Sequence, residues 1–210
     1  MIVIMDYGVG NVKSVINAAR HIGSDVKVSC QVEDINNADG IILPGVGACG
    51  YAMKVLGDLA DVVRQVASTG KPLLGICVGF QLLFDESHEH GCHKGLGLID
   101  GKVIPIPSTD PNTGQSLTIP HMGWNLVNLP DDMPLFEGLT PAKHFAFANS
   151  YYADVTDPDA KVAYTSYGID IAGAVQKDNV FGCQFHPEKS GNDGLKVLRN
   201  FDLICKRNKQ

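Results

Sequence analysis

The strongest constraint on this chain is a Gly-x-Cys-x-Gly motif, Gly75 to Gly79, between a predicted strand and a predicted helix. The apolar run 72–76 is long enough for a buried strand, and apolar residues recur at helical spacing over 79–84. This spacing is that of a nucleophile elbow, a strained turn that exposes its central side chain beside the free N–H groups of a helix N-terminus. The alternative is a small buried cysteine after a core strand. The motif makes Cys77 the candidate nucleophile.

Length and composition indicate one ordinary globular domain, residues 1–210, which can bury a core without disulfides or metals. The formal net charge of −6 argues against nucleic acid or an anionic membrane surface as the main partner. No run approaches the roughly 20 apolar residues of a membrane span, and the first five residues lack the features of a signal peptide. The six cysteines are scattered without a C-x-x-C pair, so we expect a reducing, cytoplasmic setting.

The order of predicted elements indicates the fold class. In the first half, strands and helices alternate: strands at 2–5, 25–29, 41–43 and 73–76, and helices at 12–22, 51–67 and from 79 onward. The second half is predicted as strands at 98–107, 117–129, 143–152, 162–167, 169–176 and 180–185, closed by a helix at 191–206. We therefore expect an α/β fold: a single doubly wound, mostly parallel or mixed sheet flanked by helices, with antiparallel strands extending one edge. Ligands of such sheets bind beyond the carboxyl ends of the strands, where Cys77 would lie.

A His-Pro-Glu tripeptide, His186 to Glu188, follows the last predicted strand. Pro187 disfavours helical geometry at His186, and in an extended chain residues i and i+2 point to the same side. Glu188 can then fix the His186 ring in one tautomer while the other ring nitrogen faces a thiol. By itself the tripeptide also fits a solvated loop. Combined with the elbow, it predicts a triad of Cys77, His186 and Glu188.

These two motifs resemble the signature of the class I, or triad, glutamine amidotransferases, G-x-C-x-G-x-Q followed near the C-terminus by H-P-E. The resemblance implies that Cys77 attacks the side-chain amide of L-glutamine, that His186 transfers the proton and that Glu188 orients His186. A thioester would form, ammonia would leave, and water would release glutamate. The resemblance implies no cofactor and no metal. It also implies glutamine contacts from three residues, Gln81, Ser150 and Tyr151.

A second glycine-rich segment, Gly45 to Gly50, follows the third predicted strand. Its G-x-G-x-x-G spacing alone suggests a dinucleotide site, but it does not follow the first strand and no acidic residue closes the next strand, as a ribose would require. In the amidotransferases, the corresponding loop supplies backbone N–H groups to an oxyanion hole, a role that suits glycine. The predicted oxyanion-hole residues are Gly45, Val46, Gly47 and Val78.

Three further segments, Asp6 to Asn11, Pro120 to Asn125 and Gln184 to Ser190, narrow the resemblance. Together they are similar to the glutaminase subunits of imidazole glycerol phosphate synthase, over essentially the whole chain. This implies a heterodimer with a (β/α)8 synthase subunit that uses the ammonia to make imidazole glycerol phosphate and AICAR in histidine biosynthesis. The residues predicted to face that partner are Asn11, His121, Met122, Trp124 and Lys189. By composition alone, a lone Trp is more often a core residue.

Two features depart from a simple match. Asn149 stands where the family usually carries a histidine. This departure bears on how glutamine hydrolysis is coupled to the reaction that uses the ammonia. Residues 87–93 contain several metal-type ligands, but their spacing fits no standard zinc site, so a solvated loop is favoured.

Three other functions stay open at this point. A paralogous glutaminase could feed a barrel partner in nucleotide-sugar amidation. A cysteine hydrolase or peptidase could use a related elbow. A non-catalytic regulatory module is disfavoured by the intact triad.

Overall fold

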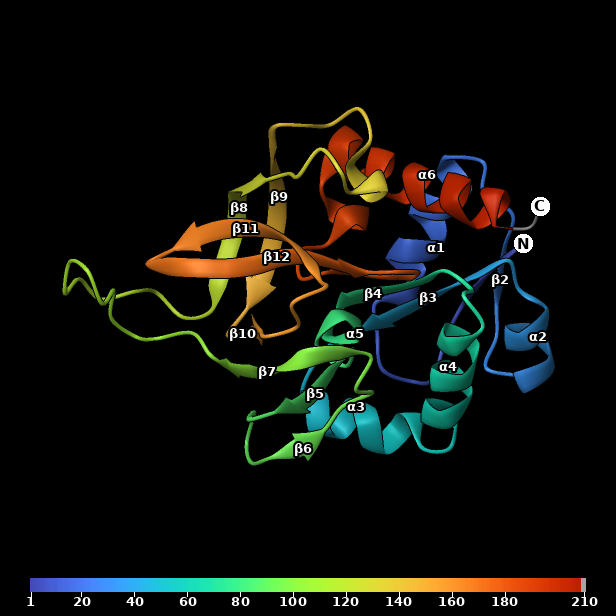
Figure 1. Ribbon diagram of the computed structural model, residues 1–210, viewed down its shortest axis with the longest axis horizontal. Coiled ribbons are helices and arrows are strands. Elements are labelled where there is room, and N and C mark those ends of the chain that lie inside the picture. Colours follow the sequence, from blue (N-terminus) through green and yellow to red (C-terminus); the bar gives the residue numbers. More distant parts are fainter. Residues whose placement is uncertain (209–210) are drawn as a thin grey trace.

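The computed structural model describes residues 1–208, which form a nine-stranded mixed sheet and a four-stranded sheet (Figure 1). The strands of the larger sheet are β1 (Ile2–Ile4), β2 (Val26–Val28), β3 (Gly40–Gly45), β4 (Leu73–Cys77), β8 (His121–Asn128), β9 (Ala142–Asn149), β11 (Lys161–Tyr167), β12 (Ile169–Lys177) and β13 (Val180–Cys183). Those of the smaller sheet are β5 (Phe84–Ser87), β6 (His93–Lys94), β7 (Ile99–Pro105) and β10 (Tyr151–Val155). The helices are α1 (Val12–His21), α2 (Val32–Asn37), α3 (Cys49–Leu56), α4 (Leu59–Ser68), α5 (Val78–Gln81) and α6 (Gly191–Arg207), with 3₁₀ helices η1 (Pro134–Phe136) and η2 (Pro187–Lys189).

The large sheet has the order β2-β1-β3-β4-β13-β12-β11-β8-β9. Strands β2, β1, β3, β4 and β13 pair in parallel, and the remaining strands continue the sheet antiparallel from β13. Helices α1 and α6 cover one face of the parallel part, and α3 and α4 cover the other (Figure 1). The predicted fold class, a mixed α/β sheet with an antiparallel extension, is confirmed.

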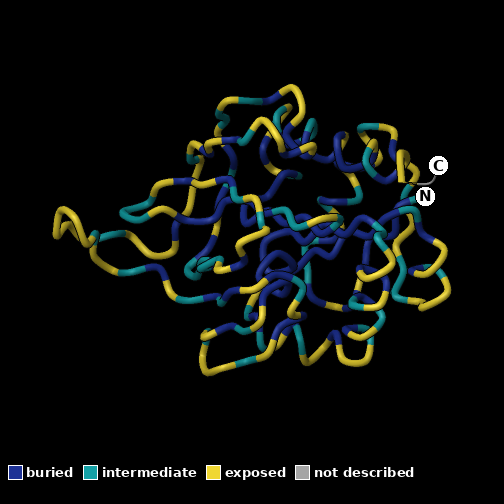
Figure 2. Tube along the Cα trace, viewed as in Figure 1, coloured by how far each residue is buried: buried dark blue, intermediate teal, exposed yellow. Residues whose placement is uncertain are grey.

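The core runs along the parallel strands. Strands β1, β3, β4 and β13 are buried at every residue, as expected for strands covered on both faces, whereas the turns around them are exposed (Figure 2). Strand β4 lies between β3 and β13. The segments that leave the carboxyl ends of these three neighbouring strands therefore converge at one place, as expected for an open α/β sheet.

Two helix predictions need correction. The single helix expected over 51–67 is two helices, α3 and α4, because the chain turns at Gly57 with φ of +52°. The helix expected to run from 79 through Phe84 ends after four residues, and Phe84 begins strand β5. The ring of Phe84 still packs edge-on against Phe80, with centroids 5.2 Å apart. The helical spacing of apolar residues therefore identified core residues correctly but not their backbone conformation.

Neither the smaller sheet nor α2 was predicted. The strands of the smaller sheet have the order β10-β7-β5-β6. The strand expected over 143–152 is divided at Ser150: β9 belongs to the large sheet, and β10 pairs with β7 in the small one. The division places Ser150 and its neighbours between the two sheets. No helix within residues 1–208 is long and apolar enough to span a membrane.

Candidate active site

Cys77 occupies a strained turn at the junction of β4 and α5, with φ of 57° and ψ of −110°. The flanking glycines are required by close backbone contacts. A Cβ on Gly75 would lie 2.5 Å from the Gly79 carbonyl oxygen, and a Cβ on Gly79 would lie 1.8 Å from the carbonyl oxygen of Leu43. Positive φ is costly for a residue with a side chain and concentrates at functional positions. The nucleophile elbow predicted from the motif is therefore the local geometry of Cys77.

His186 lies on the segment that leaves β13, next to β4. Its backbone is extended, with φ of −99° and ψ of 96°, as Pro187 requires. Its Nδ1 lies 2.8 Å from Glu188 Oε1, and both side chains are almost completely buried. The predicted contact exists, but the 3₁₀ turn of η2 makes it, rather than the side-chain alternation of an extended strand.

The electrostatics of His186 link it to both other members of the predicted triad. Burial acts to lower the pKa of His186, but hydrogen bonds to Cys77 and Glu188 outweigh burial and raise the pKa to about 9. The ring therefore holds a proton more firmly than a free imidazole. A histidine so placed between a thiol and a carboxylate can take a proton from the thiol and return it to a leaving group.

Hydrogen bonds to β9 and to the start of α6 fix the backbone around His186. Its N–H donates to the Ala146 carbonyl at 2.9 Å, and its carbonyl accepts from the Ser190 hydroxyl at 2.7 Å. The Ala146 N–H in turn donates to the Ser190 oxygen at 3.0 Å. Strand β9 and the N-terminus of α6 therefore hold the backbone that carries the ring.

The predicted oxyanion loop follows β3, the neighbour of β4. Gly45 is in register with Cys77, and a Cβ on Gly45 would lie 2.8 Å from the Gly79 nitrogen. Gly47 has φ of +82° with open space around it. The Tyr7 hydroxyl donates to the Pro44 carbonyl at 2.9 Å and ties down the start of the loop. Position 45 requires glycine because the backbone of Gly79 approaches it closely, and position 47 favours glycine because its φ is positive.

A cavity of about 550 Å³ opens over Cys77, within the range of small-molecule sites. Its lining joins both sheets. It contains the predicted site residues Val46, Gly47, Cys77, Val78, Gln81, Ser150, Tyr151, His186 and Lys189, together with Ala48, Glu89, His90, Pro120, Ala148 and Asn149. Glu188 lies behind His186 and outside this lining, as expected for a residue that acts through the imidazole.

Comparison with known proteins agrees with this geometry. Residues 3–204 match the family described as "Glutamine amidotransferase class-I". The chain belongs to this family. Proteins named imidazole glycerol phosphate synthase subunit HisH, from Methanosarcina acetivorans and Bacillus cereus (strain G9842), are each 46% identical to it. The alignments cover 97% of this chain and 98% and 95% of theirs.

Solved structures show the same fold at lower identity. A glutamine amidotransferase crystal structure is 20% identical, with a TM-score of 0.74 over 98% of this chain and all of the other. The structure of PurLQS from Thermotoga maritima is also 20% identical, with a TM-score of 0.72 over 95% of this chain and 96% of that one. The predicted family and the prediction of a glutamine amidotransferase enzyme are thus confirmed.

Among the residues around Cys77, Gln184 was not predicted. Gln184 is completely buried, and its Nε2 lies 4.0 Å from the Cys77 sulfur. Its Oε1 accepts a 3.0 Å hydrogen bond from Gln81 Nε2, which lies 3.5 Å from the Tyr151 carbonyl. The Gln81 amide therefore faces this buried network as well as the cavity. The available signal was the position of Gln184, two residues before His186.

The segment 87–93 was predicted as a solvated loop, and residues 88 and 90–92 are indeed exposed, but the segment also supplies one wall of the cavity. Ser87 is fully buried, and Glu89 and His90 line the cavity. The Glu89 carboxylate accepts a hydrogen bond of 2.8 Å from the Cys49 N–H, at the start of α3. The contribution to the cavity was not predicted because the second sheet, which brings this segment over the oxyanion loop, has no local sequence signal.

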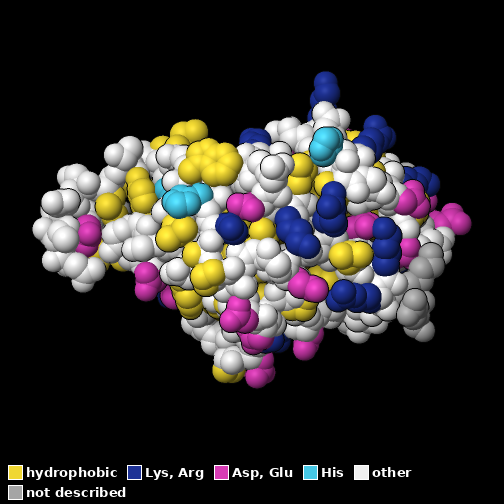
Figure 3. Space-filling view, turned by 90° about the horizontal axis from the view of Figure 1, so that it is seen from above, with side chains coloured by type: hydrophobic (Ala, Val, Ile, Leu, Met, Phe, Trp, Pro, Cys, Tyr) yellow, Lys and Arg dark blue, Asp and Glu magenta, His cyan; other side chains and the backbone are white. Residues whose placement is uncertain are grey.

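The residues predicted to face a partner divide into two groups. Met122 and Trp124 are 71% and 59% exposed on one face of β8, which excludes a core role for Trp124. Lys189 is exposed and Asn11 is half-buried. Figure 3 shows the molecule from above, with hydrophobic side chains gathered over the half that carries β8 and β9 and Lys and Arg side chains over the half that carries α6.

His121 differs from the others. It is only 3% exposed and is stacked between Phe147 and Tyr167, at centroid distances of 4.7 and 4.1 Å. Burial lowers the pKa of His121 to about 4. Its side chain therefore offers a partner no surface, and the interface prediction is wrong for this residue because His121 points to the opposite face of β8 from Met122.

Asn149, which stands in place of the family's histidine, lies at the edge of the cavity. Its Nδ2 donates to the Tyr151 carbonyl at 3.0 Å, while its Oδ1 has no hydrogen-bond partner within residues 1–208. It is in register with His121 on the neighbouring strand. Its side chain holds the backbone next to the predicted glutamine contacts.

Proposed function

We propose that this chain is the glutaminase subunit of an imidazole glycerol phosphate synthase. It hydrolyses L-glutamine to glutamate and ammonia through a thioester on Cys77, and it delivers the ammonia to a (β/α)8 synthase subunit in histidine biosynthesis. The observation that carries the hydrolysis is the buried series Cys77, His186 and Glu188 beside a cavity of about 550 Å³, which is large enough for an amino acid. Relatives that are 46% identical are named as subunits of imidazole glycerol phosphate synthase, which supports this enzyme's synthase subunit as the destination of the ammonia.

Glutamine binds in the cavity with its side-chain amide toward Cys77. Glu89 supplies a carboxylate to the lining and suits the α-ammonium group of the substrate. Backbone groups of Ser150 and Tyr151, at the division between β9 and β10, complete the predicted glutamine contacts, with Gln81 beside them. Tyr151 belongs to β10 and Gln81 to α5, while Ser150 joins β9 to β10 and Glu89 follows β5, so each contact adjoins an element that fixes its position.

The reaction then proceeds in two halves. His186 takes the thiol proton of Cys77, and the sulfur attacks the amide carbon. The backbone N–H groups of Gly45 to Gly47 and of Val78 stabilise the oxyanion. His186 returns the proton to the leaving nitrogen, so ammonia departs and a thioester remains. Water, deprotonated by His186, then attacks the thioester and releases glutamate, while Glu188 keeps the ring in the required tautomer.

The partner docks over the mouth of this cavity. Met122 and Trp124 provide an exposed apolar surface on β8, and Lys189 and Asn11 provide polar groups beside it. Docking covers the exit, so ammonia passes to the acceptor without being lost to solvent. It also acts on the open Gly47 region, where a peptide flip could turn an N–H toward the oxyanion. One such donor is worth about 10²–10³ in rate.

The test is glutamine hydrolysis by the full chain, alone and with a histidine-pathway synthase subunit plus its acceptor. We expect slow hydrolysis by the chain alone and strong stimulation in the complex. Full turnover by the lone chain, unchanged by the partner, contradicts the role of docking. Stimulation by a nucleotide-sugar amidating barrel, and none by the histidine-pathway subunit, assigns the chain to the other acceptor.

A further inference from the structure

The β5–β6 hairpin presents two different faces. The strands pair antiparallel, with Glu86 opposite Lys94 and Ser87 opposite His93. Ser87 and Glu89 point inward, since Ser87 is buried and the Glu89 carboxylate contacts the Cys49 N–H. Because side chains alternate along a strand, Glu86 and His88 lie on the outer face.

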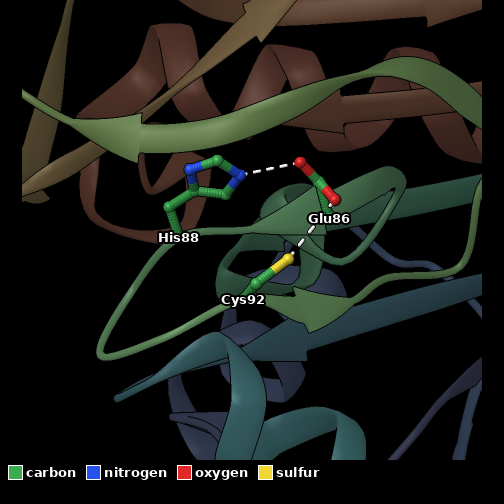
Figure 4. Close-up of side chains that lie close together, drawn as sticks. All are labelled: Glu86, His88 and Cys92. Carbon is green, nitrogen blue, oxygen red and sulfur yellow. Dashed lines mark hydrogen bonds and ion pairs between the residues drawn. The ribbon is translucent and has the colours of Figure 1, made fainter.

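Cys92 lies at the far end of the turn and joins this outer face. Glu86 Oε1 is 2.7 Å from His88 Nε2, and Glu86 Oε2 is 3.4 Å from the Cys92 sulfur. One ligand atom from each residue lies within 4.8 Å of the other two. Figure 4 shows the three side chains pointing toward one another, with the Glu86 carboxylate between the imidazole and the thiol.

We propose that Glu86, His88 and Cys92 form a Zn²⁺ site on the β5–β6 hairpin. A tetrahedral Zn²⁺ with bonds of about 2.0–2.3 Å holds its ligand atoms about 3.3–3.6 Å apart. The Glu86–His88 contact of 2.7 Å is shorter than this, the Glu86–Cys92 contact of 3.4 Å falls within it, and no two of the ligand atoms are more than 4.8 Å apart. Cys92 and His88 are exposed and Glu86 is half-buried, so rotamer changes can close the remaining gap.

The chemistry of the three ligands favours zinc over magnesium or calcium. One thiolate, one imidazole and one carboxylate are ligands of a borderline-soft ion, whereas the harder ions prefer sets of oxygen ligands. The thiolate and the carboxylate together carry two negative charges, which match Zn²⁺. Three protein ligands leave a fourth position for water.

The surroundings of the site are partly cationic. Lys94 is opposite Glu86 in the hairpin, and Lys102 is in register with Glu86 on β7. Lys102 lies 4.0 Å from Asp154, which offsets part of its charge. In the metal-free state the thiol donates to Glu86, so metal binding must release the Cys92 proton to solvent and replace that hydrogen bond with bonds to the metal.

The site has a consequence for catalysis that rests on the proposed function. Its ligands bracket the turn 89–91, and two residues of that turn, Glu89 and His90, line the glutamine cavity. A metal bound to His88 and Cys92 fixes both ends of the turn. Occupancy should therefore restrain the cavity wall that faces the oxyanion loop.

The experiment is a Co²⁺ titration of the full chain carrying Cys77→Ala, which removes the active-site thiol as a competing ligand. We expect one equivalent of Co²⁺ to give a thiolate-to-metal charge-transfer band, and one equivalent of Zn²⁺ to abolish it. Cys92→Ser should eliminate the band, and His88→Ala should weaken binding more than about 100-fold, beyond the loss typical of a residue that only supports a ligand. Cys30→Ser and His144→Ala, which alter a thiol and an imidazole elsewhere, serve as matched controls.

A second readout follows the hairpin itself. Zn²⁺ should slow hydrogen exchange of residues 86–94 in the Cys77→Ala chain and leave it unchanged in the Cys92→Ser double variant. The site is refuted if no charge-transfer band forms, if the band survives Cys92→Ser, or if the Cys30→Ser or His144→Ala control abolishes it. Because neither readout involves glutamine, the site can fail while the proposed function stands, and the reverse also holds.

Discussion

Replacing Glu188 with Gln should lower the pKa of His186 and remove part of the pH dependence of folding stability. In the wild type the Glu188 carboxylate lies 2.8 Å from His186 Nδ1, and its side chain is 1% exposed. The substitution keeps an oxygen acceptor near the ring but removes the negative charge. The protonated ring then loses its ion-pair partner, and that ion pair is strong because both groups are buried.

The magnitude follows from the pKa of His186. It rises from an ordinary value of 6.5 to about 9 in the folded chain. Because one pKa unit is worth about 1.4 kcal/mol, the protonated ring stabilises the fold by about 3 kcal/mol. The folded pKa is raised, so this stabilisation is complete below pH 6.5 and is lost as the pH rises through about 9. Cys77 also raises the pKa, so we assign about half of the effect, roughly 1.5 kcal/mol, to Glu188.

The assay is urea unfolding at pH 6 and pH 9.5, with a chelator present throughout. The quantity compared is the fall in unfolding free energy between the two pH values, which should be smaller in Glu188→Gln than in the wild type. The matched control is Glu86→Gln, which breaks an exposed Glu–His pair with a contact of 2.7 Å. That variant should keep the wild-type pH dependence, because solvent screens an exposed pair. Equal falls in wild type, Glu188→Gln and Glu86→Gln would refute our account of the His186 environment.

Three further substitutions test other parts of the structure. Gly79→Ala should destabilise the fold by about 3 kcal/mol or more in urea unfolding, because its Cβ would lie 1.8 Å from the Leu43 carbonyl oxygen. The control is Gly10→Ala, whose Cβ would have its nearest contact at 3.5 Å, and equal losses of stability in the two variants would contradict this reading. Trp124→Ala should weaken the complex with the synthase subunit by about 2 kcal/mol in calorimetry while leaving the stability of the chain within about 0.5 kcal/mol; the opposite pattern would show that the interface is misplaced. Asn149→His should leave basal glutamine hydrolysis nearly unchanged and alter, at most, its stimulation by the partner, because only the histidine can carry charge near pH 7. A large change in the basal rate of hydrolysis would place the side chain among the groups that act on glutamine.

The parts of the site that the sequence predicted are those set by short-range geometry. Gly75 and Gly79 are needed because the backbone of α5 packs directly on β4 and on β3, and this need is visible in the motif itself. Pro187 restricts His186 in the same local way. The carboxyl ends of neighbouring parallel strands then bring the two motifs together, which a predicted α/β fold implies.

The parts that were missed depend on pairing between distant segments. Glu89 reaches the cavity because β5 pairs with β7, which itself pairs with β10. Gln184 contacts the Cys77 sulfur only through the register of β13 against β4. The burial of His121 follows from the face that β8 turns toward the core, since a shift of one residue would have exposed it. Apart from the position of Gln184, two residues before His186, these relations leave no local signal in the sequence.

The most direct test of the central claim is to look for the covalent intermediate on Cys77. The complex of the chain with its synthase subunit is quenched with acid during glutamine turnover, digested, and analysed by mass spectrometry. We predict a glutamyl adduct on the peptide that contains Cys77, absent without glutamine and absent in Cys77→Ala, which should lose glutamine-dependent synthesis but still support synthesis from added ammonium salt. Glutamine turnover by Cys77→Ala within tenfold of wild type, or an adduct on another residue, would contradict the account.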